Sequence, residues 1–585
     1  MYLNKLKLTQ FRSCLDTSIS LQPDLTVLVG ENNGGKSNII DAIRLLTLPL
    51  NGRRERYAEE DDVTHGSDPE QFLIESHYSG MSDTLRGLLV TAMPDPATDL
   101  AIFGCKYIKK PPGSVRGKFS YWSGDFDTTE PETGSNELVR HVYLPALRDA
   151  QQALGSGSTS RLIALFRHFL PEDQEDVFVE EMQRDSDANT HEVLTNMNTE
   201  IGTALSELTS GAREQSAEIS FVTQKIQDVA RDLRFKLGDS GIDMEDIGSS
   251  GLGYANLLYM STIVVELAKA KESDLTIFLV EEPEAHLHPQ LQMLVLEFLL
   301  ERAKQSISRE ITAGNPEGRI QIIVTTHSPN LTAEVSPKHL VIVRSSHTEE
   351  TEQKTTKCIP VSEIEVHENV LKKVGRYLDV TRSSLLFSGK AILVEGMAEA
   401  LLIPLFAKKF VFTTDAQKSE FLRFRAASLI SIDGVDFKPY LQLLLTPFEG
   451  TRLGENIVVI TDGDPQLQGN RKQDLDAFAA SVDAADNLNV YVNSVTFEHE
   501  LYNAGNQEFL KNVFLKLHPL SEDRWQTDVD EKPVAERAAA FVDLLKNTKT
   551  RKGDFAQEIA LAIENDGVFV LPTYLRDAIL QSSVL

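Results

Sequence analysis

The stretch that decides the fold is Leu25-Thr26-Val27-Leu28-Val29-Gly30-Glu31-Asn32-Asn33-Gly34-Gly35-Lys36-Ser37. Residues 25–29 are mostly apolar and predict a buried strand, and the residues that follow Ser37 predict the start of a helix. Residues 30–37 match the pattern GxxxxGK(S/T) in the strand–loop–helix setting that this pattern needs. Such a loop surrounds phosphates with backbone N–H groups at a helix N-terminus. The sequence therefore predicts a nucleotide-binding α/β domain.

The side chains of this loop predict how the nucleotide is held. We expect Lys36 to reach the β- and γ-phosphates and Ser37 to ligate Mg²⁺. The predicted nucleotide-binding residues are Gly30, Asn32, Asn33, Gly34, Gly35, Lys36 and Ser37. ATP with Mg²⁺ is therefore the expected cofactor of the N-terminal half.

Two more apolar segments end in polar residues that suit the same site. Residues 276–280 lead into Glu281 and Glu282, and residues 321–326 lead into His327. The carboxyl ends of parallel strands are where α/β sheets bind their ligands. We assign Glu281 to the Mg²⁺ shell, Glu282 as the general base for the attacking water, and His327 as a contact to the γ-phosphate.

A second group of acids follows strand-like segments of the C-terminal half. The apolar segments 391–394 and 457–461 each lead into two carboxylates, which are Glu395, Glu399, Asp462 and Asp464. Glu395 and Glu399 lie one helical turn apart, and an extended chain directs both Asp side chains the same way. Hard oxygen ligands suit Mg²⁺ or Mn²⁺, and two-metal phosphodiester cleavage needs such a cluster to hold ions roughly 4 Å apart. These acids predict a metal-dependent hydrolytic site.

The composition indicates a globular, multidomain protein of the cytoplasm. With 585 residues, 41% of them hydrophobic, the chain exceeds one core, and no signal peptide or membrane-length apolar run is visible. The net charge of −29 opposes DNA binding, which depends on Lys and Arg. A local basic strip is either a DNA contact or a solvated helix end, and it comprises Lys546, Lys549, Arg551 and Lys552. Three isolated cysteines, Cys14, Cys105 and Cys358, are expected to be packing residues.

Changes of pattern along the chain predict four segments. Residues 1–154 have the mixed character of an α/β lobe, and residues 155–235 have apolar residues at helical spacing, which predicts a helical insertion suited to dimerisation. The α/β character returns in 236–382, as the second part of a split domain. Residues 383–585 alternate strands and helices, which predicts a separate domain with a mainly parallel sheet.

The order of the N-terminal motifs, with Ser249-Ser250-Gly251-Leu252-Gly253 before the second strand, resembles the ABC-type ATPases related to SMC and RecF proteins. In that family the serine–glycine signature of one protomer completes the nucleotide site of another. The resemblance implies that Ser250 and Gly251 bind nucleotide across a dimer closed by ATP. The signature here departs from the usual LSGGQ of that family, because it lacks the Gln.

The acids of the C-terminal half, EGxxE followed by DxD, resemble the Toprim domain of topoisomerases, primases and overcoming-lysogenisation-defect (OLD) nucleases. The preceding ATPase selects the OLD family, so that the resemblance covers nearly the whole chain. By that likeness Glu498 would join the metal shell, Lys552 would stabilise charge on the scissile phosphate, and Gly434 is a further match.

The leading hypothesis is therefore a homodimeric or larger metal-dependent DNA endonuclease controlled by ATP, with Mg²⁺ or Mn²⁺ at its Toprim site and a role in defence against phage or in phage exclusion. An alternative is an ATP-gated DNA-binding clamp or repair scaffold whose Toprim domain is catalytically silent. A primase or topoisomerase is less favoured, because an ABC ATPase is the wrong companion for either. The chain contains no helicase motif set, so a helicase partner would be a separate protein.

Overall fold

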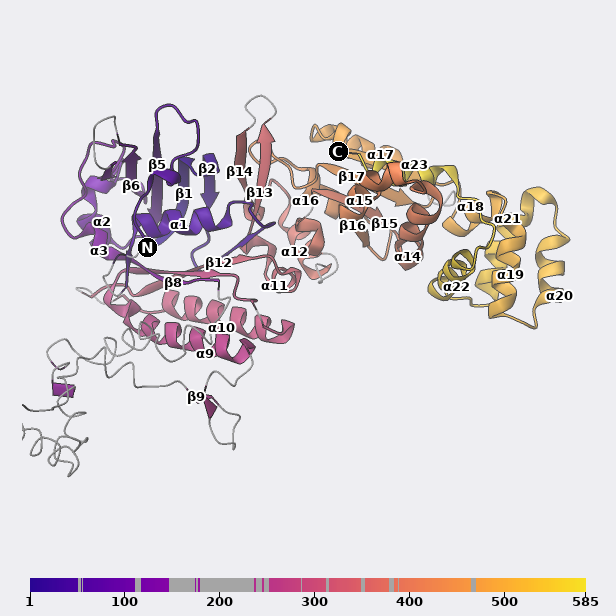
Figure 1. Cartoon of the computed structure of the whole chain (residues 1–585), viewed down its shortest axis with the longest axis horizontal. Helices are drawn as coiled ribbons and strands as arrows, with labels where there is room; N and C mark the ends of the chain where they lie inside the picture. Colours follow the sequence, from indigo (N-terminus) through magenta and orange to yellow (C-terminus); the bar gives the residue numbers. More distant parts are fainter. Residues whose placement is uncertain are drawn as a thin grey trace, which may run out of the picture.

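The computed structural model describes residues 1–146 and 252–584, apart from gaps at 51–53, 55, 111–116, 286, 312–314, 349–352, 378–382, 388 and 464–469. Between 147 and 251 it describes only residues 174, 177–178, 236–237 and 245–246, so the insertion predicted at 155–235 lies almost wholly outside the described residues. The N-terminal sheets occupy one end of the molecule, a second parallel sheet lies in the middle, and a helical region forms the other end (Figure 1). No helix in the described part is long and apolar enough to cross a membrane.

A seven-stranded sheet in the order β14-β13-β3-β12-β11-β8-β4 forms the centre of the N-terminal part. Its strands are β3 (Leu25–Val29), β4 (Leu48–Pro49), β8 (Val139–Leu144), β11 (Leu275–Glu281), β12 (Arg319–Thr326), β13 (Leu340–Thr348) and β14 (Gln353–Pro360). Neighbouring strands pair in parallel, except that β13 and β14 are antiparallel. The predicted strands at 25–29, 276–280 and 321–326 are confirmed, and their carboxyl ends meet at one edge of the sheet.

The two faces of this sheet enter different hydrophobic cores, because side chains alternate along a strand. Ile277 and Leu279 of β11 pack with α1 (Lys36–Leu46) and with a five-stranded antiparallel sheet. Phe278 and Val280 pack on the opposite face with α9 (Leu252–Glu266) and α10 (Pro289–Ile307), which lie below the sheet in Figure 1. The second sheet comprises β2 (Cys14–Ser20), β1 (Tyr2–Phe11), β5 (Gln71–Ser79), β6 (Ala101–Ile108) and β7 (Lys118–Ser123).

Short elements complete this part of the chain, and its cysteines lie in the interior. The short helices are α2 (Asp83–Leu88), α3 (Ser135–Leu138), α11 (Pro329–Glu334) and α12 (Glu368–Tyr377), and the two-residue strands β9 (Lys236–Leu237) and β10 (Glu245–Asp246) pair with each other. Cys14, Cys105 and Cys358 are buried and free, as expected of packing residues.

The C-terminal part contains a second sheet of four parallel strands, which confirms the parallel sheet predicted there. Its order is β16 (Ser428–Ser431), β15 (Lys390–Val394), β17 (Asn456–Thr461) and β18 (Leu488–Val492). Leu393 and Val459 face the core that also holds Leu443 of α16 (Lys438–Leu445), whereas Val394 and Val458 face the core that holds Leu402 of α14 (Met397–Phe406).

Helices surround this sheet and extend beyond it. They are α15 (Lys418–Ala426), α17 (Arg471–Ser481), α18 (Phe497–Asn503), α19 (Gln507–Leu517), α20 (Glu522–Trp525), α21 (Arg537–Asn547), α22 (Lys552–Glu564) and α23 (Thr573–Gln581). Trp525 packs between the rings of Phe514 and Phe541, with ring centroids 5.4 and 5.6 Å away. Because α22 packs on α14, the start of α22 is carried towards the sheet.

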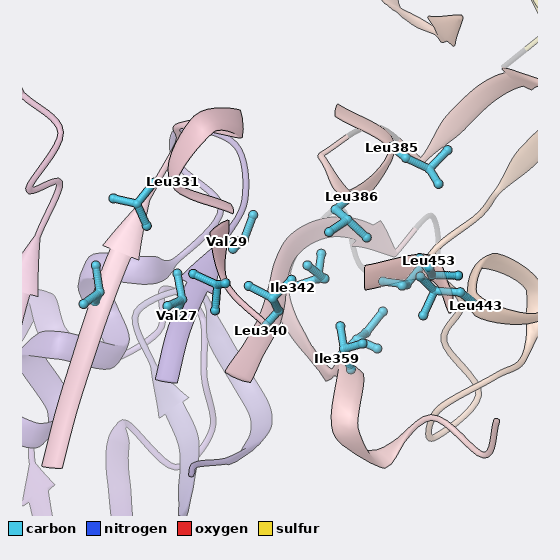
Figure 2. Packing of buried hydrophobic residues seen from close by; sticks show 14 of the residues in the cluster. Val27, Val29, Leu331, Leu340, Ile342, Ile359, Leu385, Leu386, Leu443 and Leu453 are labelled. Atoms are coloured by element: carbon cyan, nitrogen blue, oxygen red, sulfur yellow. The ribbon is translucent and has the colours of Figure 1, made fainter. Parts of the chain in front are cut away.

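One apolar cluster is continuous between the two halves of the molecule. Strands β13 and β14 supply its middle, and segments next to the C-terminal sheet supply its other side (Figure 2). The members at the junction are each at most 1% exposed, and they are Leu340, Ile342, Ile359, Leu385, Leu386, Leu443 and Leu453. Interfaces between mobile domains are usually more polar than this. The continuous core therefore holds the C-terminal sheet against the β13–β14 hairpin.

Candidate functional site

The glycine-rich loop lies between β3 and α1, directly against β13. A Cβ atom at Gly30 would overlap the carbonyl oxygen of Val343, so only glycine fits there. Gly35, the residue before α1, has a φ of 105°, a conformation that L side chains rarely adopt. Asn32 and Asn33 are exposed on the loop, and Ser37 is exposed at the start of the helix. The loop thus leaves its polar surface open to a phosphate group.

Lys36 is turned back onto the loop that it terminates. Its Nζ donates to the carbonyl oxygens of Gly30 and Glu31, both at 2.8 Å, and lies 3.2 Å from Nδ1 of His327. Burial lowers the pKa of Lys36 to about 8, against the opposing pull of the carboxylates led by Glu282. A triphosphate would supply the negative charge that this buried ammonium group needs.

The acids after β11 take different partners. Glu281 accepts a hydrogen bond from the hydroxyl of Tyr143 at 2.8 Å through its Oε2. Glu282 has a φ of 45°, and its Oε1 lies 2.8 Å from Nε2 of His327. The Nδ1 of His327 lies 2.8 Å from the carbonyl oxygen of Gly30. Lys36, Glu282 and His327, which lie far apart in the sequence, are therefore in one hydrogen-bonded group.

Two residues at this edge were not assigned from the sequence. Glu284 accepts hydrogen bonds from the Thr326 hydroxyl at 2.7 Å and from the His327 backbone N–H at 2.8 Å, which fixes the turn after β11 against β12. Tyr143 of β8 donates the hydrogen bond to Glu281, and nothing in the local sequence distinguishes Tyr143 from a packing residue. The signature residues Ser250 and Gly251 lie outside the described residues.

The C-terminal acids meet at the carboxyl edge of the four-stranded sheet. Glu395 directly follows β15 and Asp462 directly follows β17, its parallel neighbour. The Oε1 of Glu395 accepts a hydrogen bond from the backbone N–H of Asp462 at 2.7 Å and another from the hydroxyl of Thr461. The N–H of Gly434 donates to the carbonyl oxygen of Glu395 at 3.0 Å. Parallel pairing thus joins segments that the sequence separates widely.

Two further acids, Glu399 and Glu498, and the amide group of Asn493 surround Asp462. Asp462, Glu399 and Glu498 are 7%, 6% and 6% exposed, respectively. Burial, together with the other carboxylates, raises the pKa of Asp462 to about 7 even though Asn493 donates a hydrogen bond to its Oδ1 at 2.6 Å. Burial also raises the pKa of Glu399. The mutual repulsion of these groups marks a place where a cation would be stabilised.

Lysine and arginine side chains already pair with two of these acids. The Nζ of Lys552 lies 3.2 Å from Oε1 of Glu498, and Nη1 of Arg471 lies 2.7 Å from Oε1 of Glu395. Within the described part of the chain, no three His, Cys, Asp or Glu side chains are arranged so that they could hold a metal ion. The buried carboxylate oxygens are nevertheless the donors that Mg²⁺ and Mn²⁺ prefer, so binding would require these ion pairs to open. Asp464 lies outside the described residues.

Three residues near these acids had no assigned role. Asn493 follows β18 and orients Asp462, and Arg471 begins α17. Tyr574 of α23 has a phenol whose pKa burial raises well above its usual value, with Asp462 and Glu399 nearby. No sequence signal distinguishes these residues, because each lies on an element that only the fold brings to this edge.

Comparison with known proteins assigns a family to both halves. The model of an AAA ATPase domain matches residues 1–78 and 106–332, and the model of an overcoming lysogenization defect protein-like Toprim domain matches residues 386–464. The Old nuclease of Escherichia phage P2 is 24% identical over 441 residues, which cover 70% of each chain. The endonuclease GajA of Bacillus cereus strain VD045 is 22% identical over 501 residues, which cover 81% of this chain and 76% of that protein.

Among solved structures, the C-terminal region of the Burkholderia pseudomallei OLD protein aligns over 33% of this chain and 96% of its own, with 25% identity and a TM-score of 0.24. The family assignment rests instead on the two domain models, which follow one another along the chain as the motifs do. This chain therefore belongs to the OLD (overcoming lysogenisation defect) family, in which an ATPase domain is followed by a Toprim domain.

Proposed function

We propose that this protein is an ATP-binding and ATP-hydrolysing endonuclease that cleaves DNA at its Toprim domain with divalent metal ions. The observation that carries the proposal is the burial of Glu399, Asp462 and Glu498 beside Glu395 at one sheet edge. Buried carboxylates that repel one another are costly for a fold unless a cation offsets them. A metal-binding role accounts for this cost.

The residues of the Toprim site have separate tasks in this proposal. Divalent ions held by Glu395, Glu399, Asp462, Asp464 and Glu498 would supply Lewis-acid activation of the phosphodiester and of water. Lys552 has a side chain that is 65% exposed, so a phosphate group can reach it. Partial loss of water around the Lys552 ammonium group opposes its charge, but attraction by Glu498 raises the pKa of Lys552 and keeps the group charged. Lys552 is therefore suited to stabilising negative charge on the phosphate.

The ATPase site supports a second chemical step. Glu282 is the general base for the attacking water, and the contact of its Oε1 with His327 orients it. Glu281, held by Tyr143, serves the Mg²⁺ shell. We further propose that Ser250 and Gly251 of one protomer complete the nucleotide site of another, so that ATP controls the geometry of a dimer.

The β13–β14 hairpin gives a physical route between the two sites. Lys354 of β14 donates to the carbonyl oxygen of Asn33 in the phosphate-binding loop at 2.7 Å. Arg344 of β13 donates through Nη1 to the carbonyl oxygen of Leu453, which lies just before β17. Two acids attract the guanidinium group of Arg344, namely Glu31 in the phosphate-binding loop and Glu455 just before β17. A shift of the loop on binding ATP would therefore move groups that also contact the Toprim domain.

Plasmid cleavage tests the proposal. Supercoiled DNA is incubated with Mg²⁺ or Mn²⁺, with and without ATP, using the parent protein, Glu395→Ala and Lys36→Ala. Glu508→Ala, which removes an exposed acid from α19, is the matched control. We expect Glu395→Ala to abolish nicking and linearisation while ATP hydrolysis continues, and Lys36→Ala to remove the effect of ATP on cleavage. Undiminished cleavage by Glu395→Ala would show that the assigned site is wrong.

The alternative is an ATP-gated clamp or repair scaffold with a silent Toprim domain. The ion pairs of Glu395 with Arg471 and of Glu498 with Lys552 are the observation in its favour, since they neutralise two metal ligands. ATP hydrolysis and DNA binding without any nicking, over a range of divalent ions, would favour it.

Phage defence or exclusion as the biological role, and a separate helicase as partner, stay predictions. The biological role can be tested by plating phage on cells that carry the gene with and without Glu395→Ala.

A further inference from the structure

The carboxyl edge of the Toprim sheet already contains a permanent positive charge. Arg471 is the first residue of α17 and one of the residues not assigned from the sequence. Its Nη1 donates to Oε1 of Glu395 at 2.7 Å, to the carbonyl oxygen of Asp462 at 2.8 Å, and to the hydroxyl of Thr461. A guanidinium group keeps its proton in proteins, so this charge is present at every physiological pH.

The contact saturates one oxygen of a carboxylate that is predicted to bind metal. The hydrogen bonds described for the Glu395 side chain all reach Oε1, from Thr461, the N–H of Asp462, and Arg471. The side chains of Glu395 and Arg471 are only 16% and 19% exposed. An ion pair that is largely removed from water is stronger than a surface pair and is screened less by salt. Arg471 thus provides part of the charge compensation that this group of acids needs.

We propose that Arg471 is the internal counter-ion of the Toprim site. It neutralises Glu395; when that carboxylate holds a divalent ion, the guanidinium group would leave it and bind a phosphate group of DNA. This inference rests on the proposed function and adds the residue that links metal binding to substrate binding. No covalent step is involved.

Charge and geometry favour Arg471 over the other cation of the site. Two cations on one carboxylate repel each other, so a divalent ion and Arg471 compete for Glu395. Planar guanidinium groups bind phosphate through two parallel hydrogen bonds, which suits Arg471 to a second, anionic partner at the same edge. Lys552 pairs with Glu498 instead and has no described contact with Glu395. The two cations therefore have different tasks.

Metal binding without DNA tests the first half of the proposal. Mn²⁺ is titrated calorimetrically into the full-length, nucleotide-free protein and into Arg471→Gln, Arg471→Lys and Glu395→Ala. Lys472→Gln is the matched control, because it removes a positive charge from the same helical turn. Lys472 donates to the carbonyl oxygen of Val490 at 2.8 Å. We expect Arg471→Gln to bind Mn²⁺ about tenfold more tightly, the scale of one competing charge-assisted contact. Arg471→Lys should lie nearer to the parent, and Lys472→Gln should differ less than twofold.

Binding of a short DNA duplex, measured by fluorescence anisotropy with Ca²⁺ as the divalent ion, tests the second half. Arg471→Gln should bind the duplex about tenfold more weakly than the parent, and Arg471→Lys should recover part of this loss. Lys472→Gln, the control, should bind the duplex as the parent does. Unchanged or weaker Mn²⁺ binding by a folded Arg471→Gln, judged by circular dichroism, would overturn the counter-ion role. Tighter Mn²⁺ binding with unchanged DNA binding would overturn the phosphate role.

The Glu395→Ala variant separates this inference from the proposed function. In one outcome, Glu395→Ala loses Mn²⁺ binding and cleavage, whereas Arg471→Gln changes neither the Mn²⁺ affinity nor the DNA affinity. The nuclease proposal would then stand, and the counter-ion role of Arg471 would be wrong. Retention of both properties in Glu395→Ala would instead remove the nuclease site itself, and the counter-ion with it.

Discussion

Replacing Asp462 by Asn removes a charge from the Toprim site with almost no change of shape. Asp462 is 7% exposed and accepts a hydrogen bond from Asn493 at 2.6 Å, which an amide oxygen can also accept. Burial is the main reason that its pKa is raised to about 7, with Glu395, Glu399 and Glu498 adding to the effect. We expect Asp462→Asn to abolish metal-dependent cleavage and, without metal, to make the protein more stable at pH 8.

The magnitude follows from the pKa in the folded and unfolded chains. The pKa rises from 3.8 to about 7 on folding. Below pH 3.8 the carboxyl group is neutral in both states and costs nothing. As the pH rises from there to about 7, only the unfolded chain releases the proton, so the folded parent loses stability. At about 1.36 kcal/mol per pH unit, the loss above pH 7 is roughly 4 kcal/mol, as an upper limit.

Thermal unfolding with a chelator, at pH 5 and pH 8, measures this effect. The unfolding midpoint of Asp462→Asn should exceed that of the parent by several degrees at pH 8 and by clearly less at pH 5. The control is Asp486→Asn, an exposed acid of the same domain, which should behave as the parent at both pH values. Adding Mn²⁺ should stabilise the parent and not the variant. An equal difference at the two pH values, or no gain at pH 8, would refute the reasoning.

Four other outcomes test the remaining assignments. Lys36→Ala should weaken binding of a fluorescent ATP analogue by at least about tenfold, since it removes charge-assisted contacts to phosphate; unchanged binding would contradict the role of the loop. Glu282→Gln should still bind ATP but release phosphate about 10²- to 10⁴-fold more slowly, and normal turnover would exclude it as the base. Tyr143→Phe removes the hydrogen bond to Glu281 and should raise the Mg²⁺ concentration needed for half-maximal ATP hydrolysis a few-fold, whereas an identical Mg²⁺ titration would make Tyr143 a packing residue. Leu453→Ala, at the fully buried junction, should cost about 2–5 kcal/mol in denaturant unfolding; a loss below about 1 kcal/mol would mean that the site is not tightly packed.

Local patterns were sufficient to predict the main strands and the acids that follow them. The apolar runs before Gly30, Glu281, Glu395 and Asp462 are short and end sharply in polar residues, which is typical of buried parallel strands. Strands β3, β11, β15 and β17 occupy those runs. Because parallel strands end at a common edge, this information also predicted that acids distant in the sequence would meet there.

Residues without a motif could be assigned only after the chain had folded. Tyr143, Asn493 and Arg471 reach the two sites from elements whose neighbours are chosen by sheet order and helix packing. The continuous core at Leu340 and Leu453 likewise depends on how two sheets are placed against each other. A sequence records which side chains a segment carries, whereas the partners of a buried charge depend on packing among distant segments. The amino-acid sequence alone therefore determined which carboxylates stand at the strand ends, and tertiary structure decided which cations and hydroxyl groups lie against them, because electrostatic partners are selected by distance in space.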